Sequence, residues 1–164
     1  MTHPLRGRDF RLLAAARVLS LTGDAAVPAA LALAVLRATG STSALALVLG
    51  CAMVPRLLLL PLGGVLADRL DARGVALTTD LAAAAAQLFA ALELLGGEPR
   101  LGHLAAAQVI GGAASAFQAP TISPLIAGTV EPSGLQKANS LMGLANGATR
   151  LAGPALAGTF VLTA

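Results

Sequence analysis

The chain has 164 residues, of which 56% are hydrophobic and 12% are charged, and its formal net charge is +3. Soluble domains carry about 25% charged residues, so this composition excludes an ordinary water-soluble surface and indicates a membrane protein. The basic residues lie between apolar runs rather than in one patch, and the chain has no Trp or Tyr for stacking on bases. We therefore expect no nucleic-acid partner.

Five apolar segments follow one another along the chain, and each is long enough to cross a bilayer, which needs about 20 helical residues. They predict an all-α membrane protein, because they are too long and too little alternating for transmembrane strands. An alanine-rich soluble bundle is the alternative, and five such runs in succession disfavour it. Short connectors containing Gly, Pro and Ser separate the segments. The expected spans are residues 12–36, 44–66, 75–95, 101–126 and 138–164.

The connectors also predict an orientation, because cytoplasmic loops carry an excess of Lys and Arg. One side of the membrane would hold only Arg37 and Arg100. The side that holds the N-terminus would carry Arg6, Arg8, Arg11, Arg69, Arg73 and Lys137. We therefore expect a multi-pass protein of the cell (plasma) membrane, the inner membrane of a bacterium, with its N-terminus in the cytoplasm.

The most distinctive connector is the charged elbow between the second and third spans, Gly63–Arg73, which reads GGVLADRLDAR. It resembles the cytoplasmic loop motif of the major facilitator superfamily, roughly G-x-x-x-D-R-x-G-R-R. The residues that match this motif are Gly64, Asp68, Arg69 and Arg73. Asp71 stands in place of the later glycine, as is familiar from the multidrug and siderophore exporter branch.

Further stretches resemble the same branch in the same order, so the resemblance covers essentially the whole chain. They are AFQAP at 116–120, EPSGLQKANSL at 131–141 and RLAGPALAG at 150–158. Two positions depart from the branch pattern: Gln108 stands where a membrane arginine is frequent, and Thr149 where a glycine is common. The resemblance implies five helices of an N-terminal six-helix half. The sixth span and the C-terminal half are then missing, and this truncated chain is expected to be inactive alone.

The resemblance also implies that the elbow is a gating loop. Asp68 ends a helix, where a carboxylate meets the negative end of the helix dipole unfavourably. Its expected partner lies in the second half of the transporter, and the pairing would hold the cytoplasmic side closed. Arg69 and Arg73 would help to hold this gate. The alternative is that the charges only orient the turn.

Ionisable residues inside the apolar spans are the other candidates, because they are costly in a bilayer and often functional. Asp24 lies about 18 Å along the first span and suits proton coupling or the recognition of a cation. Arg150 lies at a similar depth in the fifth span, and we expect the two to pair, functionally or only structurally. Arg56 is a further candidate, for substrate contact or helix pairing. Asp80 is expected to pair with an arginine of the elbow.

The fifth span concentrates small residues in the segment that resembles the antiporter motif. Gly153, Pro154 and Gly158 are expected to bend this helix and to let it approach a neighbour closely. Strict four-residue spacing is absent between the two glycines, which disfavours a simple dimerisation stripe.

No enzyme motif is present, neither a phosphate-binding G-x-x-x-x-G-K-[ST] loop nor a G-x-S-x-G elbow. With one Cys and no acidic or histidine cluster, no metal site and no cofactor are expected. The predicted function is efflux of drugs or small amphipathic molecules by alternating access, as an antiporter driven by a proton gradient. Its partners would be the substrate, the lipid bilayer and the missing C-terminal half. The rivals are a non-transporting scaffold or assembly module of five helices and a membrane-embedded enzyme.

Overall fold

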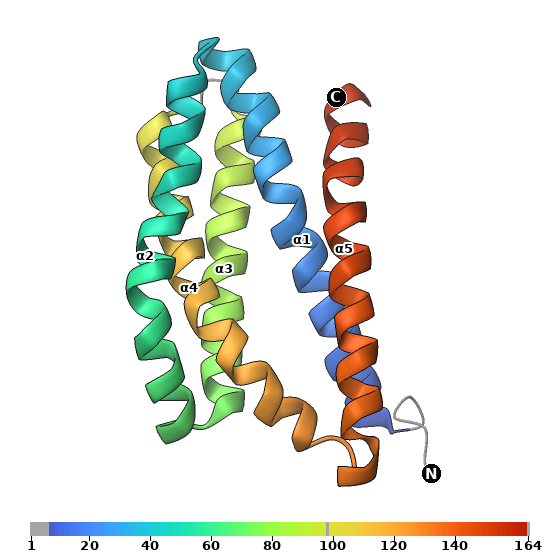
Figure 1. Ribbon diagram of the computed structural model, residues 1–164. Coiled ribbons are helices and arrows are strands. Elements are labelled where there is room, and N and C mark those ends of the chain that lie inside the picture. Colours follow the sequence, from blue (N-terminus) through green and yellow to red (C-terminus); the bar gives the residue numbers. More distant parts are fainter. Residues whose placement is uncertain (1–6, 98, 164) are drawn as a thin grey trace. The chain divides into compact units, whose positions relative to one another are not determined.

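The computed structural model describes residues 7–97 and 99–163, apart from the side chains of residues 66–69, 119 and 160–163. In this part of the chain all regular structure is helical (Figure 1), which confirms the predicted all-α class. The elements are α1 (Arg8–Thr39), α2 (Thr42–Arg69), α3 (Ala72–Leu95), α4 (Leu101–Ala127), the 3-10 turn η2 (Pro132–Gly134) and α5 (Leu135–Thr163).

The helices extend a few residues beyond the predicted apolar runs because polar flanking residues complete their ends. After α1, Gly40 adopts a φ of 63° and its N–H donates to the carbonyl of Leu36 at 2.9 Å. This left-handed conformation favours glycine and ends the helix. The hydroxyl of Ser41 then accepts from the N–H of Ala44 at 3.2 Å and caps the start of α2.

The chain divides into two compact units. The first contains the described residues up to Ala30 and those from Ser123 onward, and therefore pairs the first part of α1 with α5. The second is Leu31–Ile122, which contains α2, α3 and most of α4.

In the second unit, α4 packs against α2 at two places where a glycine replaces a larger side chain. A Cβ at Gly63 would lie 2.5 Å from the carbonyl oxygen of Ala116. A Cβ at Gly112 would overlap the backbone of Ala52. The two helices therefore approach to backbone contact, as small residues allow in membrane helices.

In the described residues, α1, α2 over Thr42–Val65 and α3 are long and apolar enough to cross a membrane. The bent α4 is a fourth candidate if its two parts make one span. α5 is not among these candidates, because Asn146 and Arg150 interrupt its apolar residues, so a fifth span stays a prediction.

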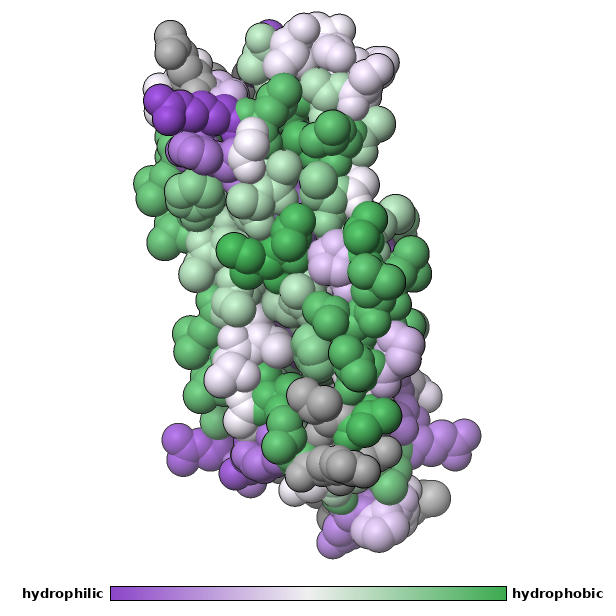
Figure 2. All heavy atoms as spheres, turned by 90° about the vertical axis from the view of Figure 1, so that its left-hand side faces the viewer, coloured by the Kyte–Doolittle hydropathy of each residue, from purple (hydrophilic) through white to green (hydrophobic). Residues whose placement is uncertain are grey.

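The surface of α2 supports the membrane class. Val54, Leu57 and Leu58 are 59%, 69% and 70% exposed, which is unfavourable in water but not in lipid. Figure 2 shows the face on which α2 lies, with hydrophobic side chains over its middle and strongly hydrophilic ones towards its ends. The protein is therefore an all-α membrane protein.

Candidate functional site

The charged elbow joins α2 to α3, and one of its residues caps the start of α3. Asp71 is the N-cap of α3, and its Oδ2 accepts from the N–H of Gly74 at 2.8 Å. Arg73 and Gly64 are exposed, and a Cβ at Gly64 would meet no atom within 4 Å. The side chains of Asp68 and Arg69 lie outside the described part, so the gate predicted from them stays a prediction.

Asp24 and Arg150 both belong to the first unit, where α1 and α5 run in the same direction (Figure 1). The two helices touch where a Cβ at Gly153 would lie 2.5 Å from the Cβ of Ala25. Arg150 lies about 4.5 Å before this contact along its helix, and Asp24 about 1.5 Å before it, at 1.5 Å per residue. Asp24 and Arg150 therefore lie at a similar depth along their helices, as the sequence predicted.

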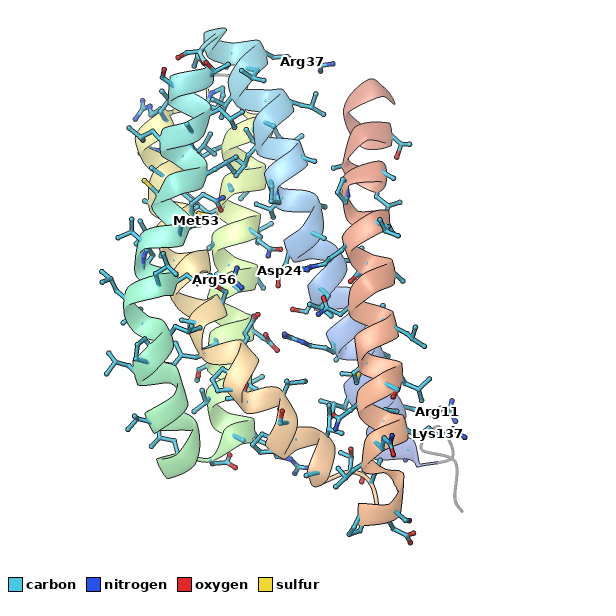
Figure 3. All side chains as sticks on the ribbon, in the orientation of Figure 1. Arg11, Asp24, Arg37, Met53, Arg56 and Lys137 are labelled. Atoms are coloured by element: carbon cyan, nitrogen blue, oxygen red, sulfur yellow. The ribbon has the colours of Figure 1, made fainter. Side chains whose placement is uncertain are left out.

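The directions of the two side chains are a separate question from their depth. The half-buried Asp24 leaves α1 on the side away from α5 (Figure 3). Arg150 is exposed, and no ion pair of Arg150 is found among the described residues. The backbone contact through Gly153 fixes which faces of the two helices meet, and Asp24 is not on the meeting face of α1. The structure thus places the two residues at one level, and their pairing stays a prediction.

The small-residue motif of α5 also separates into distinct roles. Gly153 is buried and forms the close contact with α1, as expected of a helix-approach residue. Pro154 lies inside the helix next to it and is exposed. Gly158 has open space where a Cβ would be, so it makes no comparable contact in this structure.

Arg56 lies in the middle of α2 and is exposed. In Figure 3 its side chain leaves α2 on the side on which α3 lies. It forms no hydrogen bond and no ion pair within the part of the chain that the structure describes.

Asp80 has a partner that the sequence did not indicate. The buried Gln118 of α4 donates from Nε2 to Oδ1 of Asp80 at 2.8 Å, across 38 residues of sequence. This bond joins α3 to α4 and satisfies a carboxylate inside an apolar bundle. The sequence offered one indication of this bond, a glutamine within the apolar stretch AFQAP. The spacing of residues along the chain does not identify which helix that glutamine faces.

A second polar pair joins the end of α3 to the start of α4. Nδ1 of His103 lies 2.9 Å from Oε1 of Glu93, whose other oxygen accepts from the backbone N–H of Arg100 at 3.4 Å. The ring of Phe89 lies 5.7 Å from that of His103, centroid to centroid. The sequence alone did not indicate this pair, because the two residues lie on different helices, ten positions apart. Within the described residues no group of three potential metal ligands occurs.

The sequence was compared with curated proteins, solved structures and protein-family models to identify its family. No curated protein and no solved structure matches the chain significantly. A family model described as Major Facilitator Superfamily matches residues 13–164, which is nearly the whole chain. Together with the apolar helices, this match supports a multi-pass membrane protein and a transporter of the major facilitator kind. The chain belongs to the Major Facilitator Superfamily.

Proposed function

We propose that this chain is part of a proton-coupled exporter of small amphipathic molecules or drugs, of the multidrug and siderophore exporter branch, working by alternating access. The observation that carries the proposal is Asp24, a half-buried carboxylate midway along α1. A carboxylate at that depth is costly when charged and unpaired, so its proton affinity responds strongly to what surrounds it. A group that gains and loses a proton as its surroundings change is what coupling to a proton gradient requires.

The other candidate residues take supporting roles in this proposal. The close contact of Gly153 with Ala25 fixes α5 beside the helix segment that carries Asp24. Arg150, at the same level, contributes positive charge near that segment. Pro154 and Gly158 shape α5 beyond the contact.

The elbow is the proposed gate, with Asp68, Arg69 and Arg73 facing a partner in a second six-helix half and Asp71 ordering the start of α3. Superfamily transporters place the substrate between two such halves. In this proposal the N-terminus is cytoplasmic and the membrane is the plasma membrane.

The proposal is tested with Asp24→Asn in the full-length gene product, expressed in cells lacking their own dye exporters. The wild type is expected to extrude rhodamine 6G, and a proton uncoupler should abolish the extrusion. Asp24→Asn removes the titrating group while keeping the shape, so it should lose uncoupler-sensitive efflux with normal insertion into the membrane.

The matched control is Asp9→Asn, which neutralises an exposed carboxylate in the first turn of the same helix. Asp9→Asn should extrude the dye like the wild type. Full proton-dependent efflux by Asp24→Asn would exclude Asp24 as the coupling residue, and a wild type without uncoupler-sensitive efflux would contradict the proposed function.

A further inference from the structure

We propose that Arg56 binds the anionic group of an amphipathic substrate, so that the transporter accepts organic anions such as carboxylates and sulfonates with apolar bodies. This inference rests on the proposed transport function and adds the class of substrate. It starts from the position of a permanent positive charge at the middle of a helix long and apolar enough to span the membrane.

The first step is that lipid does not surround the guanidinium. At 1.5 Å per residue, Arg56 lies about 21 Å from Thr42 and about 14 Å from Val65, the ends of the apolar part of α2, so snorkelling to an interface is unfavourable. Its side chain leaves α2 towards the side of α3 (Figure 3). The middle of the face shown in Figure 2 correspondingly carries hydrophobic and weakly polar side chains and no strongly hydrophilic one.

The second step concerns the counter-ion. Within the described part of the second unit, Asp80 is the carboxylate nearest to mid-helix, and Nε2 of Gln118 donates to it at 2.8 Å. The other described carboxylates of this unit are Asp71, which caps α3, and Glu93, which pairs with His103. Each of the three already has a hydrogen-bond partner, and none forms an ion pair with Arg56.

The third step is what an unpaired guanidinium at this depth requires. A buried or membrane-embedded charge is stable only with an opposite charge or with water. The five donors of Arg form a planar fork that matches a carboxylate, sulfonate or phosphate better than the point charge of Lys does. An anionic substrate group would therefore complete a pair that the second unit leaves open.

The neighbouring residues indicate the rest of the substrate. Met53 precedes Arg56 by three positions and Leu60 follows it by four, so both lie on the same face of α2. They are 67% and 47% exposed. A flexible thioether and a leucine beside a guanidinium suit an apolar body of variable shape that carries one anionic group.

The experiment compares two dyes that share a xanthene core, the anion fluorescein and the cation rhodamine 6G. Their binding to the purified full-length gene product in lipid nanodiscs is measured by fluorescence anisotropy. Arg56→Gln should raise the Kd for fluorescein about ten-fold or more, the loss expected for one charged hydrogen-bonded contact. The Kd for rhodamine 6G should change less than about two-fold, and Arg56→Lys should retain part of the fluorescein binding.

Arg11→Gln is the matched control, because it removes the same charge from an exposed position near the start of α1 (Figure 3). It should leave both Kd values unchanged. Failure of the wild type to bind fluorescein, or an equal effect of Arg56→Gln on both dyes, would overturn the inference. Binding is measured without a proton gradient, so loss of uncoupler-sensitive efflux with anion-selective binding intact would contradict the proposed function alone.

Discussion

The residues of the charged elbow, Gly63–Arg73, indicated the family, and one of them also caps a helix. The order of Gly64, Asp68, Arg69 and Arg73 indicated the family, and the family match confirms that conclusion. Asp71 was assigned to the same gating loop, and its side chain caps α3. A capping role follows from the φ of −62° and ψ of 115° at this residue, since an extended N-cap aims its side chain at the first free N–H groups.

This cap predicts a measurable loss of stability. Asp71→Ala should destabilise the protein by about 1 kcal/mol, because the N–H of Gly74 loses its acceptor. Asp71→Ser keeps an acceptor and should retain most of the stability. The measurement is thermal unfolding in detergent micelles, followed by helical circular dichroism. Equal melting temperatures for wild type and Asp71→Ala would show that the cap contributes nothing.

At the scale of elements, helix contacts depend on which glycine faces a neighbour. The motif match selected Gly64, whereas the structure puts its neighbour Gly63 against α4. Likewise Gly112 faces α2 and Gly111 faces open space. A rotation of about 100° per residue separates adjacent helical positions, so two consecutive glycines cannot share one contact. The sequence shows that a close approach is possible, and only packing decides which glycine makes it.

The two glycines of α4 therefore give opposite predictions for one chemical change. Gly112→Ala should cost roughly 1–3 kcal/mol, because the new Cβ overlaps the backbone of Ala52 and forces α2 and α4 apart. Gly111→Ala should be neutral or stabilise by up to about 1 kcal/mol, because alanine favours the helix. Denaturant unfolding of both variants in the same detergent checks this. A Gly111→Ala variant as unstable as Gly112→Ala would contradict the assigned contact.

At the scale of the whole molecule, the order of helices and short connectors follows from the sequence, but the sides of the membrane follow only from the charge count. The connector after α2 and the turn η2 should face the cytoplasm, and the connector after α3 should face outward. This alternation requires α3 and α4 to span the membrane, and α4 is a candidate only if its two bent parts make one span.

Single cysteines on a Cys51→Ala background test this topology. Leu70→Cys and Ser133→Cys should resist a membrane-impermeant maleimide in intact cells and react in inverted vesicles, whereas Arg100→Cys should do the reverse. All three positions are exposed. Reaction of Leu70→Cys in intact cells, with protection of Arg100→Cys, would place the N-terminus outside.

The sequence by itself determined the class, the helix order and the family, because these depend on the composition of long segments and on motifs that are local in the chain. The tertiary structure alone decided the partners. It joined Asp80 to Gln118 and Glu93 to His103, and it turned Asp24 away from α5 although Arg150 lies at the same level. Depth along a helix can be counted from sequence at 1.5 Å per residue. Which neighbour a side chain faces depends on how the helix is rotated about its axis, and this rotation is set only when another helix packs against one of its faces.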